Sequence, residues 1–187
     1  MDSLKPMRAD ARRNYERLLE EAKRAFAEYG VEASLEDIAR NAGVGIGTLY
    51  RHFPTREALI ESVLRSRFDG QADRARELLT DPQPLAALHT WLAGLGDTSG
   101  AYQGLSEVMA TALSDETSRL YESCHAMQDA ASQLVERAKR AGELRPDVTT
   151  RELLLMLHAV SWAGIHLPGD GGRARLLGLV FEGLRAS

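Results

Sequence analysis

Residues 43–53 read GVGIGTLYRHF, and this stretch decides the fold. It holds three glycines and a Tyr-Arg-His cluster within eleven positions. A glycine inside a helix costs roughly 1 kcal/mol relative to alanine, so the glycines indicate a turn and a close backbone approach. We predict that Gly43 takes a positive φ in that turn and that a short helix follows over about 45–52. Pro54 then ends the helix, because the residue before a proline disfavours the α region.

Two helices are predicted before this turn. Apolar residues three or four positions apart predict a helix over about 9–29, which Gly30 stops. Ser34 has Asp37 three residues later, a pattern like a capping box, so a helix of about two turns starts there. Two short helices joined by a tight glycine turn form a helix-turn-helix, whose second helix enters the DNA major groove.

The distribution of charge supports this interpretation. The net charge of −4 at pH 7 argues against general affinity for nucleic acid. Residues 1–68 nevertheless hold 12 Lys and Arg against 11 Asp and Glu, and no acidic residue lies between Asp37 and Glu57. A carboxylate beside a phosphate would repel it, whereas the arginines and the histidine of this window can neutralise it or donate to it.

The remainder of the chain is also predicted to be helical. Thr55 caps a linking helix over 55–69, and runs of β-branched residues that would indicate strands are missing. Further helices are expected near 83–95, 101–113, 115–141, 150–166 and 172–185, with Gly142 as a stop and Thr149 as a cap. We predict an all-α protein of about nine helices: a DNA-binding helix-turn-helix domain over 1–54 and a larger helical domain over 55–187.

Composition limits the compartment. The single cysteine, Cys124, excludes an internal disulfide and indicates a reducing environment. The N-terminus has no apolar segment typical of a secretory signal, and no window approaches the roughly 20 apolar residues of a transmembrane helix. We therefore expect a cytoplasmic protein, associated with the nucleoid when it holds DNA, and no membrane partner.

The stretch SLEDIARNAGVGIGTLYRHFPTREALIESV resembles the DNA-binding signature of the TetR/AcrR family of bacterial transcriptional regulators. The likeness covers about residues 12–68 and lies in the glycine turn, Thr-Leu-Tyr, His-Phe and the following basic position. It implies an N-terminal three-helix DNA-binding domain, a linking fourth helix, and a C-terminal domain for ligand binding and dimerisation.

The resemblance also implies which residues contact DNA. Family positions that contact backbone phosphates match Ser34, Thr48, Tyr50, His52 and Arg56. Positions that face bases or the groove floor match Gly45, Ile46, Gly47 and Arg51. Gly45 stands where the family often has Ser, and Arg56 stands where Lys is usual. The loss of the serine hydroxyl, together with Ile46 at the groove face, leaves few side chains to read bases.

Two arginines carry separate expectations for DNA contact. Arg51 is the candidate for a bidentate guanine contact. Replacing Arg56 with alanine is expected to weaken binding to every duplex about equally and to flatten its salt dependence. Arg12 and Arg13 could reach phosphate from the first helix, although alternating charges on such a helix more often serve solubility.

The middle helices supply a candidate ligand pocket. Aromatic and soft apolar side chains with a few polar groups are typical of small-molecule sites, and they are Trp91, Tyr102, Met109, Tyr121, Cys124, His125, Met127, Gln128 and Trp162. The alternative, that each of them only fills the core, stays open. They include no cluster of like charges, which favours a mostly neutral, apolar effector.

The last two predicted helices are apolar on more than one side, which predicts a homodimer formed through them. The family resemblance implies the same arrangement. His158, Trp162 and His166 share one face of the first of these helices, and we interpret that face as core or pocket wall. Two histidines two turns apart cannot hold one ion alone, so we predict neither a metal site nor a cofactor.

These patterns favour a ligand-responsive homodimeric repressor, released from a palindromic DNA operator by a small molecule. An enzyme would use His125, His158 or His166 as a general base, but no nucleophile–base set is readable, so we expect no enzyme. A helical adaptor that never touches DNA would have an acid-tolerant surface over 38–56, which is not what the sequence has. The sequence does not distinguish a repressor from an activator or an architectural regulator.

Overall fold

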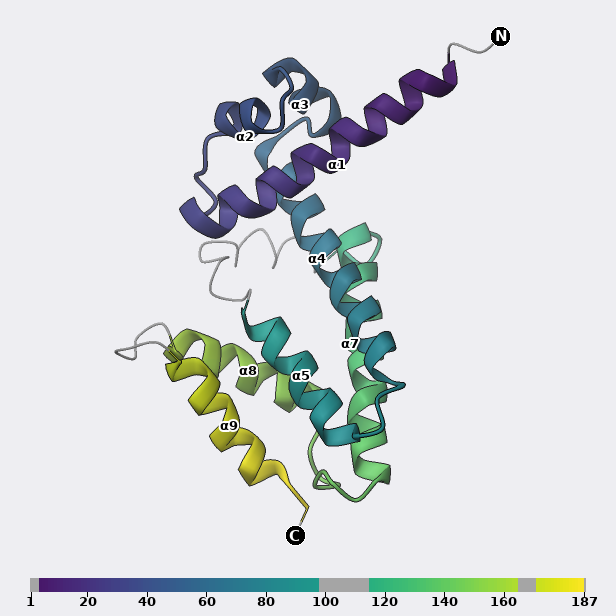
Figure 1. Cartoon of the computed structure of the whole chain (residues 1–187), viewed down its shortest axis with the longest axis vertical. Coiled ribbons are helices and arrows are strands. Elements are labelled where there is room, and N and C mark those ends of the chain that lie inside the picture. Colours follow the sequence, from purple (N-terminus) through teal and green to yellow (C-terminus); the bar gives the residue numbers. More distant parts are fainter. Residues whose placement is uncertain (1–3, 98–114, 165–170, 187) are drawn as a thin grey trace. The chain divides into compact units, whose positions relative to one another are not determined.

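The computed structural model describes residues 4–97, 115–164 and 171–186, and the regular structure in these ranges is helical (Figure 1). The helices are α1 (Leu4–Tyr29), α2 (Leu35–Asn41), α3 (Ile46–His52), α4 (Arg56–Leu78), α5 (Pro84–Asp97), α7 (Arg119–Arg140), α8 (Thr150–Gly164) and α9 (Gly172–Leu184). The all-α prediction is therefore confirmed for the described ranges. The helix predicted near 101–113 lies outside them.

The described residues pack as two compact units. Residues 4–66 with 115–121 form the first, and residues 67–97 with 122–164 and 171–186 form the second. The division falls inside α4, whereas the sequence predicted a domain boundary at 54–55. The helix is also longer than the predicted 55–69: a single glycine at Gly70 costs only about 1 kcal/mol, and burial of small apolar residues beyond it offsets this.

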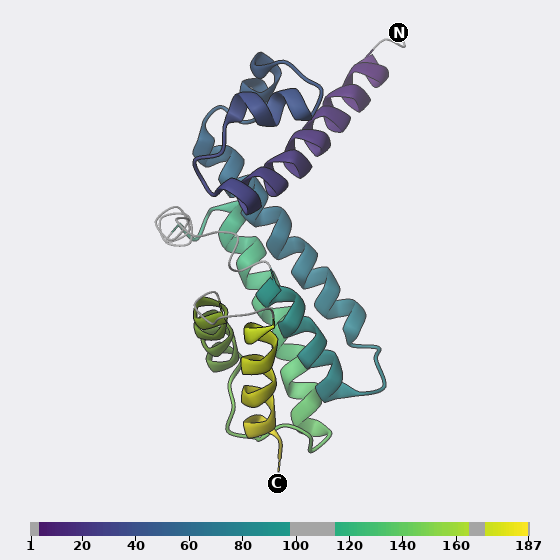
Figure 2. The same ribbon diagram turned by 60° about the vertical axis from the view of Figure 1, so that its left-hand side comes forward.

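The core of the first unit joins α1, α2 and α3. Figure 2 shows α2 and α3 on one side of α1. The apolar stripe of α1 faces these two helices, and its residues Leu18, Ala22 and Phe26 are buried. Ile38 of α2 and Leu49 of α3 are buried in the same unit. Tyr29, three positions after Phe26, is instead 67% exposed, because it is the last residue of the helix before the turn at Gly30. The packing fixes the direction of α3 on this unit.

The local signals of the helix-turn-helix are present as predicted. Ser34 is the N-cap of α2, and its Oγ accepts a hydrogen bond of 3.1 Å from the backbone N–H of Asp37. Gly43 has a φ of 69°, and its N–H donates to the carbonyl of Arg40 at 3.0 Å. These two devices begin and end α2, so the turn is encoded locally.

Replacing Gly43 with alanine should lower the free energy of unfolding by about 1–2 kcal/mol, because a side chain is strained at positive φ. The added Cβ would also lie 3.5 Å from Nη1 of Arg17, an ordinary contact that adds little. Urea denaturation measures the change. Gly70→Ala in α4 is the control: its Cβ meets nothing within 4 Å, so it should stabilise by about 0.5–1 kcal/mol. If both variants changed the free energy of unfolding in the same direction, the result would contradict this account.

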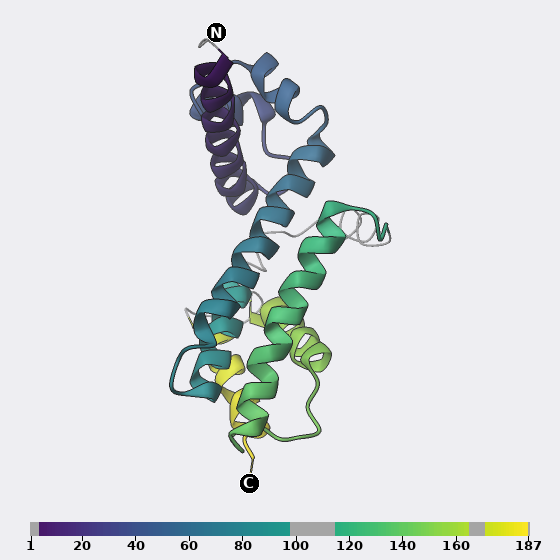
Figure 3. The same ribbon diagram turned by 90° about the vertical axis from the view of Figure 1, so that its right-hand side faces the viewer.

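The second unit is built from four helices and the second half of α4. Helices α5, α8 and α9 contact one another (Figure 2), and residues 67–78 of α4 run beside α7 (Figures 1 and 3). Arg137 of α7 donates to the carbonyls of Leu78, at 3.5 Å, and Asp81, which anchors the end of α4 to α7. Trp91 of α5 is 1% exposed and is among the largest fully buried side chains.

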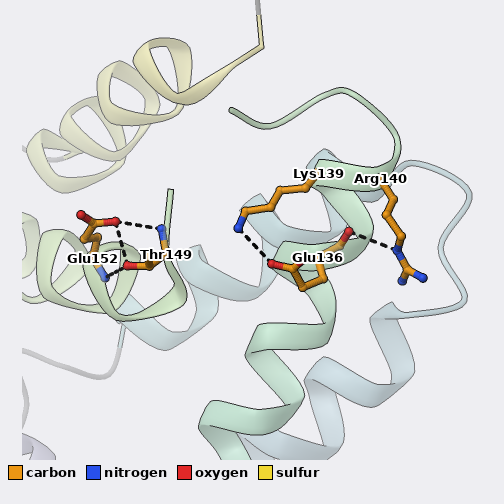
Figure 4. Close-up of polar contacts among 5 residues, drawn as sticks. All are labelled: Glu136, Lys139, Arg140, Thr149 and Glu152. Carbon is orange, nitrogen blue, oxygen red and sulfur yellow. Dashed lines mark hydrogen bonds and ion pairs between the residues drawn. The ribbon is translucent and has the colours of Figure 1, made fainter. Parts of the chain in front are cut away.

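The connection from α7 to α8 is also set by local signals (Figure 4). Gly142 has a φ of 70° and follows the end of α7. Thr149 and Glu152 form a capping box at the start of α8: the N–H of Thr149 donates to Oε2 of Glu152 at 2.8 Å, and the N–H of Glu152 donates to Oγ1 of Thr149 at 3.2 Å. The hydrogen bond from the Thr149 hydroxyl lowers the pKa of Glu152. The predicted stop and cap are thus confirmed.

Among the described helices, none has the length and apolar character needed to cross a bilayer.

Candidate nucleic-acid interface

Helix α3 has one buried side and one exposed side. Leu49 is fully buried, and Phe53, at the end of the helix, is 1% exposed. The opposite side consists of exposed Gly45, Gly47, Tyr50 and Arg51, with Ile46 and Thr48 half-buried. The buried pair holds α3 on the first unit and leaves the predicted groove-facing residues directed to solvent.

The glycines at the start of α3 are not required by the packing of the protein. Gly45 is the N-cap, with an ordinary extended φ of −75°, and it makes no side-chain cap. A Cβ added at Gly45 or at Gly47 would meet nothing within 4 Å. Gly45 stands at an N-cap, where glycine is tolerated, so the cost of glycine in a helix falls on Gly47. Packing within the described chain demands glycine at neither position.

The exposed side of α3 carries no negative charge. The acidic residues nearest to α3 in the sequence are Asp37 in α2 and Glu57 in α4. Asp37 forms an ion pair of 2.5 Å with Arg40. Among the described residues, no carboxylate forms an ion pair with Arg51, whose side chain is exposed. This side can therefore approach a polyanion without like-charge repulsion.

His52 lies on a small aromatic cluster at the end of α3. Its ring meets Tyr15 of α1 edge to face, with ring centroids 5.9 Å apart, and Tyr15 stacks on Phe53 at 5.0 Å. Arg65 of α4 donates to the hydroxyl of Tyr15 at 3.2 Å. The half-buried imidazole thus packs against Tyr15 of α1, which Arg65 of α4 holds in turn, and no local sequence pattern indicates this contact.

Two of the predicted phosphate ligands already have partners within the chain. The hydroxyl of Ser34 caps α2 and also lies 3.4 Å from a carboxylate oxygen of Glu36. The guanidinium of Arg56 is half-buried and donates through Nη1 to the carbonyls of Val31 and Ala33, both at 2.7 Å. Tyr50 is exposed and Thr48 is half-buried, while Ser34 and Arg56 are engaged in bonds that shape the unit.

The two arginines of the first helix that could reach phosphate are paired with neighbouring acids. Arg12 lies 3.4 Å from Glu16, and Arg13 pairs with Asp10. Arg17, which the sequence did not single out, lies beside the turn at Gly43 and donates to the side-chain amide oxygen of Asn14 at 2.6 Å. The position of Arg17 depends on the packing of α1 against the turn, which no local sequence pattern predicts.

Comparisons with known proteins identify the family. Residues 83–186 match the family described as "Transcriptional regulator SbtR-like, C-terminal domain", and residues 18–63 match "Bacterial regulatory proteins, tetR family". The chain belongs to the TetR family. A TetR transcriptional regulator of Streptomyces coelicolor is 35% identical, with 92% of this chain and 99% of that chain covered and a TM-score of 0.73. One from Mycobacterium vanbaalenii is 32% identical, over 97% of this chain and 100% of that one, with a TM-score of 0.69.

The curated relatives match a limited part of this TetR-family chain. An HTH-type transcriptional regulator of Staphylococcus aureus is 44% identical over 64 residues, which is 34% of this chain and 35% of that protein. The alignment thus spans about a third of the curated relatives.

The described candidates for the ligand pocket of this TetR-family protein differ in burial. In the second unit, Trp91, Cys124 and Met127 are buried, whereas His125 and Gln128 are exposed. Tyr121 is half-buried and belongs to the first unit. Tyr102 and Met109 lie outside the described residues, and so does the side chain of Trp162 in α8.

Some candidates for the ligand pocket form hydrogen bonds within the second unit. The indole N–H of Trp91 donates to the backbone carbonyl of Gln71 at 2.9 Å. The side-chain amide of Gln128 donates to Sγ of Cys124 at 3.3 Å, and burial raises the pKa of that thiol. Gln128 also lines a groove of about 610 Å³ between α7 and α8.

The face of α8 that carries His158 is exposed, whereas the sequence predicted that it forms core or pocket wall. His158 and Ala159 are exposed, and Leu155 is 60% exposed, whereas Leu153 and Leu157 are buried. A helix that is apolar all round can bury only one side within a single chain, and here the buried side is the other one. The prediction was wrong for His158 because periodicity could not tell which side faces the core; His166 lies outside the described residues.

Proposed function

We propose that this TetR-family protein is a sequence-specific DNA-binding transcriptional regulator that acts as a repressor, with α3 as its recognition helix. The observation that carries the proposal is the exposed, acid-free side of α3, with two glycines that the fold does not need. Arg51 projects from this side and is the base-reading candidate, with Ile46 against the groove floor. Thr48, Tyr50 and His52 supply phosphate contacts, to which Ser34 adds a hydroxyl at the start of α2.

The test is a fluorescence anisotropy titration with a duplex from the region upstream of the gene, called here the upstream duplex, and a random duplex of equal length. At moderate salt the upstream duplex should bind at least about a thousandfold more tightly. Equal affinity for both duplexes would refute sequence-specific binding. Binding to neither would refute DNA binding altogether.

Replacing Arg51 with alanine should weaken binding to the upstream duplex by roughly 1–3 kcal/mol and binding to random DNA by much less, because a guanine contact is lost. Anisotropy titrations on both duplexes measure the two changes. Arg24→Ala on α1 is the control, since it removes an exposed arginine that pairs with Glu21. Equal losses on both duplexes would remove Arg51 as a base reader.

We also propose a homodimer formed through α8 and α9. Support comes from large apolar side chains that each helix leaves exposed: Leu155 is 60% exposed and Leu179 is 61% exposed. A pair of recognition helices related by a two-fold axis and 34–36 Å apart would fit successive major grooves of a palindromic operator. Sedimentation equilibrium of the full chain should give twice the monomer mass, and a monomer at micromolar concentration would contradict the dimer.

Release from DNA by a small molecule is the remaining part of the proposal. Trp91, Cys124 and Met127 supply soft apolar surface inside the second unit, which suits a mostly neutral effector. An effector that binds the DNA-free conformation more tightly would shift the population away from DNA. Neutral apolar compounds that raise the thermal midpoint of the protein should also release the protein from the upstream duplex. Compounds that stabilise the protein without effect on DNA would contradict this regulation.

A further inference from the structure

Arg56 is the first residue of α4, and its backbone is fixed by a cap. Oγ1 of Thr55 accepts a hydrogen bond of 3.1 Å from the N–H of Ala58, which holds the first turn of the helix. From this fixed point the side chain reaches back by 25 and 23 positions in the sequence, to the carbonyls of Val31 and Ala33. Arg56 thus joins α4 to the loop between α1 and α2.

A single nitrogen of Arg56 makes both contacts. Nη1 carries two hydrogens, and the two carbonyls, each 2.7 Å away, take both of them. Charge-assisted bonds of this kind are stronger than neutral ones. Moving the guanidinium to a DNA phosphate would leave two carbonyls without their donor, one of them in Ala33, which is 4% exposed.

The loop that Arg56 holds determines where α2 begins. Gly30 ends α1 with a φ of 72°, and the N–H of Ala33 donates to its carbonyl at 3.2 Å. The next residue, Ser34, is the N-cap of α2, and α2 packs on α3 through its buried residues. A change in the loop would therefore change the direction of the recognition helix relative to α1 and the start of α4.

We infer that Arg56 is a positioning residue for DNA reading: its guanidinium holds the α1–α2 loop and thereby orients α3, and it does not neutralise a phosphate. This inference rests on the proposed function. It differs from the expectation drawn from the sequence, in which Arg56 contacts phosphate. The two roles predict different salt dependence, because each phosphate that a protein neutralises adds about 0.9 to the slope of log K against log[salt].

The experiment compares Arg56→Met with the wild type on the upstream and random duplexes over a range of salt. Methionine keeps an apolar stem of similar reach and removes the donors. For a positioning residue, affinity for the upstream duplex should fall about tenfold or more, random-duplex affinity should fall much less, and the salt slope should stay unchanged. Equal losses on both duplexes, with a slope smaller by about 0.9, would overturn the inference.

Two controls keep the comparison decisive. Arg24→Met on α1 removes one exposed positive charge from the same unit and should leave the ratio of the two affinities unchanged. Arg56→Lys should restore that ratio, because one ammonium group can donate to both carbonyls. Failure of the lysine variant to restore the ratio, with the protein folded, would contradict a clamp made by a single nitrogen.

A measurement on the wild type applies even if the methionine variant does not fold. The guanidinium ¹⁵N resonances of Arg56 and Arg51 are recorded in the full chain before and after addition of the upstream duplex. Those of Arg56 should stay in place while those of Arg51 move, and a comparable shift of both would overturn the inference. If the wild type shows no preference for the upstream duplex, it is the proposed function that fails, before any variant is compared.

Discussion

Replacing Gly47 with glutamate should weaken binding to the upstream duplex by several kcal/mol, which is more than about a hundredfold, while the fold stays at least as stable. Gly47 is exposed in the first turn of α3, and an added Cβ meets nothing within 4 Å, so the side chain fits. A carboxylate near the N-terminus of a helix stabilises it, and glycine is the weaker helix former. The same carboxylate would lie against the phosphates of a bound duplex, which repel it.

Anisotropy titration and urea denaturation of the same sample separate these two effects. Gly70→Glu in α4 is the matched control, since Gly70 is also an exposed helical glycine with nothing within 4 Å of an added Cβ. It should gain stability and leave DNA affinity nearly unchanged. If Gly47→Glu bound the upstream duplex as tightly as the wild type, α3 would not be the element that meets DNA.

Replacing Trp91 with alanine should lower the free energy of unfolding of the second unit by about 3–5 kcal/mol. Trp91 is 1% exposed, so its removal leaves a large cavity among buried neighbours of the core. It also removes the indole donor from the carbonyl of Gln71, 2.9 Å away. Urea denaturation followed by circular dichroism measures the loss.

Trp91→Phe separates the two contributions. Phenylalanine keeps much of the ring volume and removes the hydrogen bond, so the variant should lose clearly less stability than Trp91→Ala. Should both variants lose the same amount, the cavity would not be the main cause. A ligand that fills the space left in the alanine variant should restore part of its stability, because binding to the native state alone stabilises it.

The sequence by itself determined the features that depend on a few neighbouring residues. Gly43 takes a positive φ, Ser34 caps α2, and Thr149 caps α8, as predicted. In each case one residue supplies a backbone conformation or a hydroxyl to an N–H within three positions, and such interactions act over the distance that a sequence pattern covers. The all-α class follows from the same kind of local periodicity.

Only the tertiary structure decided which side of each helix is buried and which distant groups meet. Arg56 bonds to carbonyls 25 and 23 positions away, and Arg65 meets Tyr15 at a separation of 50. Helix α4 continues through Gly70, beyond its predicted end at residue 69, and His158 faces outward. The physical reason is that the contacts of a helix face depend on the elements packed against it, and a single chain's periodicity carries no record of those elements.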